Sequence, residues 1–234
     1  MKSSKHSHQR AIWEAEHRAP ELFPYLASER ASDRVLEFWE WLRSQESGGA
    51  LRGVEIGCGK GRNCLGLAAA GAEMTGFDFS PTAIAAANDR ALAMALRERA
   101  RFRVHDATEA WPFADASFDF AVDFFASIDI ETRVGRSYAR DELRRVLRPG
   151  GHLLVYVPSA EDEYHRVLLA ESPAEEENTF YYPGSEKIEK LYDHAELRAF
   201  YRDWSVVLER RIERSCRLHG RDYTSSSFWV ILRR

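Results

Sequence analysis

Long apolar runs are missing from this 234-residue chain. No stretch approaches the roughly 18 consecutive apolar residues that a membrane-spanning helix needs, so we expect no contact with a membrane. Residues 1–10 are polar and lack the apolar core of a signal peptide, and we expect them to fray. The protein is therefore expected to be cytoplasmic.

Basic residues do not dominate the composition either. The 33 lysines and arginines are outnumbered by 37 aspartates and glutamates, which gives a net charge of −4 and disfavours nucleic acid as a partner. Lysine is especially rare and occurs only at positions 2, 5, 60, 187 and 190. An arginine excess of this kind is typical of a GC-rich bacterial genome.

Cysteine is scarce. The chain has three, Cys58, Cys64 and Cys216, which cannot all pair, and none of them forms a C-x-x-C motif. Cys58 and Cys64 are six residues apart across an expected turn, which is a poor spacing for zinc ligands. We interpret the three cysteines as reduced thiols of a cytosolic protein and expect no metal site.

The most informative segment reads Val-Glu-Ile-Gly-Cys-Gly-Lys-Gly-Arg-Asn over residues 54–63. An apolar strand leads into three alternating glycines, Gly57, Gly59 and Gly61, and a helical stretch follows. Glycine is needed where a chain turns sharply or where a ligand contacts the backbone, and the first turn of a helix offers free N–H groups. Asp78 ends the next expected strand, where a carboxylate can accept hydrogen bonds from both hydroxyls of a ribose. The segment predicts a nucleotide-binding crossover.

The spacing of the glycines separates two classes of cofactor. Dinucleotide sites use G-x-G-x-x-G and place the pyrophosphate at a helix N-terminus, whereas this chain has G-x-G-x-G with Glu55 just before it. A carboxylate at that position would repel a pyrophosphate but suits a cationic ligand or an ammonium group. A nicotinamide dehydrogenase is therefore disfavoured. The alternative to a cofactor site is a glycine-rich turn with a purely structural role.

Strands and helices alternate along most of the chain. Strands are expected at about 51–56, 72–77, 101–104, 118–122 and 152–157, and helices at about 35–42, 62–70, 81–99, 133–147 and 195–201. This alternation predicts an α/β fold with a Rossmann-like, doubly wound and mostly parallel seven-stranded sheet. Two further strands near 205–214 and 225–232 are expected to form an antiparallel C-terminal hairpin. Ligands of such sheets bind at the carboxyl ends of the strands.

Two segments fall outside this alternation. We expect a single domain, 1–234, in which residues 1–45 form an N-terminal helical lid and residues 159–192 form a cap inserted after the fifth strand. The insertion carries an acidic run at 175–177, which we interpret as a solvated loop, and an aromatic cluster. These aromatic residues could close over the site or could simply form a local apolar cluster.

Several motifs occur in the order found in class I S-adenosylmethionine-dependent methyltransferases. Residues 55–61 resemble motif I of that superfamily, residues 111–119 are similar to its passage into strand four, and residues 142–151 to its motif before strand five. The resemblance covers about residues 35–157 and implies S-adenosylmethionine as the cofactor. The cofactor-binding residues that it implies are Glu55, Gly57, Cys58, Gly59, Gly61, Asn63, Asp78, Phe79, Asp106, Ala107 and Asp123.

The resemblance also implies individual roles. Asp78 would hold the ribose and Phe79 would lie against the adenine, while Asp106 would accept a hydrogen bond from the adenine amine with Ala107 beside it. Residues 61–63 and 71–78 and the closing hairpin look like the tellurite-resistance and thiopurine methyltransferase-like group, whose members act on small nucleophiles.

The reaction implied is an in-line displacement at a sulfonium methyl, to which positioning can contribute on the order of 7–11 kcal/mol. A base would help a hydroxyl or ammonium acceptor by roughly 10²–10⁴. The candidates are Asp123 and His165, each with a structural role as its alternative. Four aromatic residues are candidate substrate contacts: Tyr25, Phe124, Tyr164 and Tyr181.

We therefore predict an S-adenosylmethionine-dependent methyltransferase that acts on a small-molecule acceptor, as a monomer or homodimer. Two alternatives remain open, a protein or peptide side-chain methyltransferase and a catalytically silent S-adenosylmethionine-binding regulatory protein. An enclosed pocket would favour the small molecule and an open groove the macromolecule. A site with no space for a nucleophile would favour the silent binder.

Overall fold

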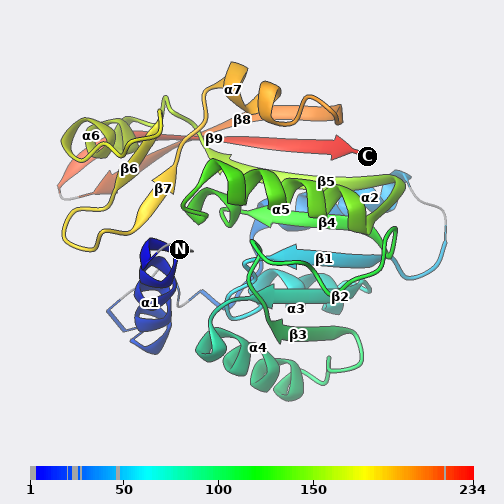
Figure 1. Cartoon of the computed structure of the whole chain (residues 1–234). Coiled ribbons are helices and arrows are strands. Elements are labelled where there is room, and N and C mark those ends of the chain that lie inside the picture. Colours follow the sequence, from blue (N-terminus) through cyan, green and yellow to red (C-terminus); the bar gives the residue numbers. More distant parts are fainter. Residues whose placement is uncertain (1–3, 20, 23–25, 27, 46–47, 219) are drawn as a thin grey trace.

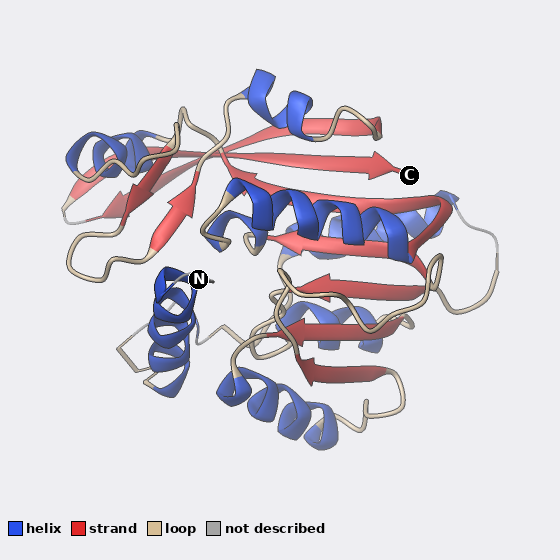
Figure 2. Cartoon of the chain, in the orientation of Figure 1, coloured by secondary structure: helices blue, strands red, loops and turns tan. Residues whose placement is uncertain are grey.

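The structure is a computed structural model that describes the chain except for residues 1–3, 20, 23–25, 27, 46–47 and 219. Its centre is a seven-stranded sheet with the strand order β3-β2-β1-β4-β5-β9-β8 (Figures 1 and 2). The strands are β1 (Arg52–Ile56), β2 (Glu73–Asp78), β3 (Ala100–Val104), β4 (Phe118–Phe124), β5 (Leu147–Pro158), β8 (Ser205–Leu218) and β9 (Arg221–Arg233).

Within this sheet β9 alone is reversed. β1 pairs in parallel with β2 and β4, and the parallel pairing continues to β3 on one side and β5 on the other. β9 is antiparallel to both β5 and β8. This arrangement confirms the predicted Rossmann-like sheet and its antiparallel C-terminal hairpin.

Helices cover both faces of the sheet because side chains alternate between the faces along each strand. One apolar cluster joins Val54 and Ile56 of β1 to α5 (Arg133–Val146) and α7 (His194–Phe200). The other joins Phe120 and Val122 of β4 to the helices of the opposite face. These are α2 (Asp33–Gln45), α3 (Arg62–Ala69) and α4 (Pro81–Ala93).

The carboxyl ends of β1 to β5 share one edge of the sheet, and the additions to the fold gather there. α1 (Ser4–Arg18) lies beyond that edge, next to the segment that holds α6 (Glu163–Glu171), β6 (Thr179–Tyr181) and β7 (Ile188–Lys190) (Figure 1). β6 and β7 form a separate two-stranded sheet. The expectation that residues 1–10 fray is wrong for α1, whose side chains bond to two other elements, as described below.

Three further details differ from the sequence expectations. α4 ends at Ala93 and not near residue 99, because Ala95 has a φ of 56° and Leu96 turns back to pack on the second apolar cluster. β4 extends to Phe124, so Asp123 lies inside the strand and not after it. The acidic run is not simply solvated, since Glu176 pairs with Arg136, whose side chain is buried.

No helix in the described part of the chain is long and apolar enough to cross a membrane. Over the same residues, the histidine, cysteine and acidic side chains form no group of three or more that could hold a metal ion. The three cysteines are free thiols.

Candidate functional site

The glycine-rich segment forms the turn between β1 and α3. Gly57, Gly59 and Gly61 have φ angles of 55°, 52° and 75°, in the left-handed region that residues with a Cβ rarely adopt. A Cβ on Gly57 would also lie 2.6 Å from the Cβ of Ala126, and one on Gly61 would lie 2.7 Å from the ring of Phe102. Backbone conformation and close packing together require the alternating glycines.

Asp78 ends β2 and ties that strand to the glycine loop. One of its carboxylate oxygens accepts a hydrogen bond from the Gly59 amide at 3.0 Å, and the other accepts one from the Ser80 amide at 2.9 Å. Burial raises the pKa of Asp78 to about 6, although the two hydrogen bonds lower it. Each oxygen has a second lone pair, so Asp78 can still accept hydrogen bonds from ligand hydroxyls.

A pocket of about 510 Å³ lies against Asp78 at the carboxyl edge of the sheet. Five of the predicted cofactor-binding residues line it: Gly57, Asp78, Phe79, Asp106 and Ala107. The others do not line it, although they surround the glycine loop or lie deeper in the sheet: Glu55, Cys58, Gly59, Gly61, Asn63 and Asp123. The fold thus brings together predicted residues that are up to 50 positions apart in sequence (57 to 107).

Asp106 lies at the end of this pocket that is next to β3. One of its oxygens accepts hydrogen bonds from the amide and the hydroxyl of Thr108, at 2.8 and 2.7 Å. Its other oxygen lies 3.6 Å from the Arg10 guanidinium. That guanidinium is also 6.0 Å from the centre of the Phe79 ring. The hydrogen bonds from Thr108 therefore fix the Asp106 carboxylate, and the Arg10 guanidinium of α1 pairs with it.

Glu55 faces away from the pocket. Its carboxylate is buried and accepts hydrogen bonds from the Asn63 amide at 2.8 Å and from the Cys64 thiol at 3.0 Å. Burial raises the pKa of Glu55 to about 7, although these bonds lower it. Both oxygens are thus engaged at the start of α3, where the acid fastens the helix to β1.

Replacing Glu55 by glutamine should raise the free energy of unfolding of the ligand-free protein by up to about 3 kcal/mol at pH 8, and change it little at pH 4. The pKa of this buried group is about 7 in the folded state, above its unfolded value. Between these two pKa values the folded state keeps a proton that the unfolded state has released, so this contribution to stability is lost as the pH rises.

Denaturant unfolding of both proteins between pH 4 and pH 8 measures this difference. The glutamine keeps an acceptor for Asn63, so a lost hydrogen bond should not hide the effect. The pKa assignment is contradicted if the difference between the two proteins is the same at every pH.

α1 is fastened to the sheet domain and to the inserted segment. On one side, the Glu14 carboxylate accepts hydrogen bonds from the hydroxyls of Ser80 and Thr82. On the other, the Lys187 ammonium lies 3.1 Å from a Glu16 oxygen. Lys187 is also 4.4 Å from the centre of the Trp13 ring. Sequence reasoning missed Gln9 and Arg10, which line the pocket, because it assigned them to a frayed end. The partners that order them are distant in sequence.

The two predicted catalytic residues do not line the pocket. Asp123 is fully buried, and one of its oxygens accepts hydrogen bonds from the amides of Ala126 and Ser127, which favours a role in positioning the turn after β4. His165 lies in the inserted segment, 3.3 Å from Asp162 and 3.6 Å from Glu189. Their catalytic roles stay predictions.

Asp129 takes the place beside the pocket that was predicted for Asp123. It belongs to the short 3-10 helix η2 (Ser127–Asp129) and lines the pocket. Burial and the neighbouring carboxylate of Glu189 raise the pKa of Asp129 well above its ordinary value, while Lys187 lowers it. Glu16 and Asp123 also face this group and raise its pKa. A pocket carboxyl group whose pKa is raised by burial and a neighbouring carboxylate is a candidate for proton transfer.

The predicted substrate contacts are dispersed. Tyr25 lies outside the described residues. Phe124 ends β4, with its ring centre 4.9 Å from that of Tyr156. Tyr164 packs against Tyr223 of the hairpin, at 5.4 Å between ring centres, and Tyr181 ends β6. Of the three that the structure describes, only Phe124 lies at the carboxyl edge of the main parallel sheet.

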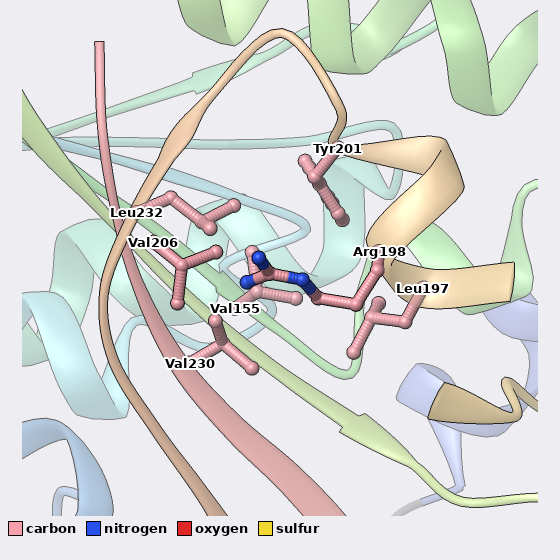
Figure 3. Close-up of a pocket in the computed structure, with 7 residues that line it drawn as sticks. All are labelled: Val155, Leu197, Arg198, Tyr201, Val206, Val230 and Leu232. Carbon is pink, nitrogen blue, oxygen red and sulfur yellow. The ribbon is translucent and has the colours of Figure 1, made fainter. Parts of the chain in front are cut away.

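A second hollow lies far from the glycine loop, between α7 and the β5, β9 and β8 part of the sheet (Figure 3). It is lined by six apolar or aromatic residues and by Arg198. The apolar side chains belong to the packing between α7 and the sheet (Figure 3). We interpret this hollow as part of the core.

Comparison with known proteins decides the family. Residues 54–151 match the family described as methyltransferase domain. A solved structure of an S-adenosylmethionine-dependent methyltransferase from Methanosarcina mazei superposes with a TM-score of 0.70 at 26% identity, over 82% of this chain and 96% of that one. Residues 54–151 therefore form a methyltransferase domain of the class I S-adenosylmethionine-dependent superfamily.

Two known methyltransferases each match less than half of this chain. It is 36% identical to the chloroplastic tocopherol O-methyltransferase of Arabidopsis thaliana over 103 residues, which are 44% of this chain and 28% of that enzyme. It is 31% identical to a sterol 4-C-methyltransferase of Caenorhabditis elegans over 103 residues, 44% of this chain and 30% of that enzyme. The match therefore spans less than a third of the length of either relative.

S-adenosylmethionine is the cofactor indicated by the family match and the solved structures, and the pocket suits it. Asp78 and Asp106 provide buried carboxylates that can accept from hydroxyl and amine groups, and Phe79 provides an aromatic face. Gly57 leaves backbone free of a Cβ that would meet Ala126. These groups lie along one wall, at the carboxyl ends of successive strands.

Proposed function

We propose that this protein transfers a methyl group from S-adenosylmethionine to a nucleophilic atom of a small molecule. The observation that carries the proposal is that α1 holds the pocket from two sides, through Glu14 to α4 and through Glu16 to Lys187 of the inserted segment. An acceptor enclosed between these elements must be small. A peptide side chain would need an open groove at the same place.

Each end of the pocket has a proposed task. Asp106 would accept from the adenine amine, Phe79 would lie against the adenine, and Asp78 would accept from the ribose hydroxyls. When bound, the cofactor supplies a methyl group already activated on a sulfonium. Because Asp106 follows β3 and Asp78 ends β2, the end of the pocket at β1 and β4 is left for the acceptor.

Asp129 lines that acceptor end, together with Ala126 and Ile130. We therefore assign to Asp129 the role of the base that takes the proton from the acceptor as its nucleophilic atom gains the methyl group. Asp123 would hold η2 in place by accepting hydrogen bonds from the amides of Ala126 and Ser127. His165 would pair with Glu189 within the inserted segment and would not contact the acceptor.

The decisive measurement is calorimetric titration of the purified protein with S-adenosylmethionine, S-adenosylhomocysteine and, as a control, NAD. One-to-one micromolar binding of the two adenosyl ligands and none of NAD would support the proposal. A panel of small amines, phenols and thiols with radiolabelled cofactor would then test transfer. Binding without transfer to any of them, or to proteins of a lysate, would favour the silent regulatory protein.

The Asp129→Asn variant should lose methyl transfer by roughly 10²–10⁴, the usual contribution of a general base, and should keep its affinity for S-adenosylhomocysteine. Asp141→Asn is a matched control, because Asp141 is an exposed carboxylate on α5. Unchanged transfer by the Asp129 variant with an amine or phenol acceptor would remove Asp129 from the reaction.

We propose further that the protein is cytoplasmic, where its three free cysteines would stay reduced. We also propose that it is a monomer or homodimer. Membership of the tellurite-resistance and thiopurine methyltransferase-like group stays a prediction from residues 61–63 and 71–78.

A further inference from the structure

A third pocket, of about 730 Å³, opens beside the start of α2 and α3, and we call it the basic pocket. Its described lining contains four arginines and one carboxylate, Asp33; the arginines are Arg30, Arg34, Arg62 and Arg214. The pocket is therefore strongly positive, although the whole chain has a net charge of −4. None of these four arginines lines the cofactor pocket.

Two of the four arginines are already paired. Arg30 lies 2.8 Å from Asp33, and Arg34 lies 2.7 Å from Glu37. In the described part of the chain, Arg62 and Arg214 form no ion pair with a carboxylate. Arg62 is half-buried, and burial lowers its pKa although Glu55 raises it. Both oxygens of Glu55 accept hydrogen bonds from other groups, Asn63 and Cys64.

The two arginines are joined by a pair of aromatic rings. The Arg62 guanidinium lies 5.5 Å from the centre of the Phe124 ring. The Phe124 and Tyr156 rings are 4.9 Å apart and inclined by 30°. An Arg214 nitrogen donates a hydrogen bond to the Tyr156 hydroxyl at 3.3 Å. Contacts with these two rings thus link the two guanidinium groups.

The basic pocket adjoins the glycine loop, because Arg62 of its lining directly follows Gly61. Gly57 lines the cofactor pocket. The Ser32 amide of the basic pocket also donates to the Asn63 side chain at 3.0 Å, which fixes that wall to the start of α3. The basic pocket and the cofactor pocket thus both border the glycine loop, through Arg62 and Gly57.

We propose that this pocket binds an anionic group, a carboxylate or a phosphate, carried by the methyl acceptor. Arg62 is its principal ligand and Arg214 its second. The planar guanidinium fork matches both kinds of anion with two parallel hydrogen bonds. The acceptor class that follows is a small acid. This inference rests on the proposed function for its link to methyl transfer.

Binding of sodium benzoate and of inorganic phosphate tests the site without any activity assay. Chemical shifts of the arginine side-chain N–H groups are followed by NMR at constant ionic strength, so that general screening stays the same. We expect Arg62→Gln to weaken binding of at least one probe roughly ten- to hundredfold, the usual effect of losing a charged hydrogen-bond donor. Arg214→Gln should weaken it severalfold. Tighter binding of benzoate would indicate a carboxylate on a ring, and tighter binding of phosphate a phosphorylated acceptor.

Arg30→Gln is the matched control, because Arg30 lines the same pocket but is paired with Asp33 and exposed. An equal loss in this variant would mean general attraction of anions and would overturn the site, as would no binding to the parent protein. Arg62→Lys keeps the charge without the fork and should show an intermediate loss, which guards against a folding defect in Arg62→Gln.

Affinity for S-adenosylhomocysteine is measured in each variant by calorimetry. Weakened anion binding in Arg62→Gln, together with normal S-adenosylhomocysteine affinity in the same variant, supports the site. Normal anion binding in a protein that fails to bind S-adenosylhomocysteine would refute the proposed function and leave the anion site standing.

Discussion

Replacing Asp78 by alanine should weaken binding of S-adenosylmethionine and S-adenosylhomocysteine by roughly 10²–10⁴. Hydrogen bonds to a charged acceptor contribute about 1.5–3 kcal/mol each, and each 1.4 kcal/mol is about tenfold in affinity. Asp78 would make two such bonds to the ribose. Its loss would also leave the Gly59 and Ser80 amides without the acceptor that holds the loop, so both effects act in the same direction. Calorimetric titration of the two proteins measures the change.

Asp119→Ala is the control for a general loss of stability. Asp119 is a half-buried carboxylate that, like Asp78, accepts hydrogen bonds, from the Arg52 amide and the Arg148 side chain, each at 2.8 Å. It lies near the start of β4, at the opposite edge of the sheet from the pocket. Near-normal affinity in Asp78→Ala, or an equal loss in Asp119→Ala, would refute the assignment of the ribose to Asp78.

The sequence was sufficient for the parallel sheet because its signals are local. The glycine loop, the Ser80 cap of α4 and the apolar alternation of the strands each depend on neighbours in the chain. Ser80 does accept a hydrogen bond from the Ala83 amide, at 3.0 Å. The end of α4 was misjudged for the opposite reason. Alanine favours helix to residue 99, but Leu96 packs on a core that lies elsewhere in the chain.

The sequence predicted the candidate site only at residues whose role follows from the motif that contains them. Gly57, Asp78, Phe79, Asp106 and Ala107 do meet at the pocket. The orientation of Glu55 was not accessible, because strand alternation does not reveal that Asn63 and Cys64 take both of its oxygens. A helical lid was predicted over residues 1–45, but not that its first turns are ordered and line the pocket with Gln9 and Arg10. Its order comes from contacts between positions as distant as Glu16 and Lys187.

The same limit applies to the acceptor end of the pocket. The sequence placed Asp123 after β4 and offered it as a base, whereas the strand continues for one more residue and buries Asp123. A shift of a few residues at the end of a strand therefore moves the proposed base to Asp129. Element ends are set by tertiary packing, which single-sequence patterns do not record.

Replacing Gly57 by alanine should destabilise the protein by about 2–5 kcal/mol and remove measurable cofactor binding. A φ of 55° costs a residue with a Cβ about 1–2 kcal/mol. The new Cβ would lie 2.6 Å from the Cβ of Ala126, and overpacking of this kind typically costs about 1–3 kcal/mol. Because neither backbone segment can move without disturbing the pocket wall, we expect both costs to be felt. Denaturant unfolding and calorimetric titration measure the two effects.

Gly59→Ala separates the two causes. Gly59 has a similar φ of 52°, but the nearest atom to a new Cβ is in His17 at 3.6 Å, an ordinary contact. We therefore expect Gly59→Ala to lose only the backbone part, about 1–2 kcal/mol. Adding Ala126→Gly to Gly57→Ala should recover the packing part, and the double-mutant cycle gives its size. If the double variant recovers nothing, backbone conformation alone keeps glycine at position 57, and the contact with the turn after β4 has no part in shaping the pocket.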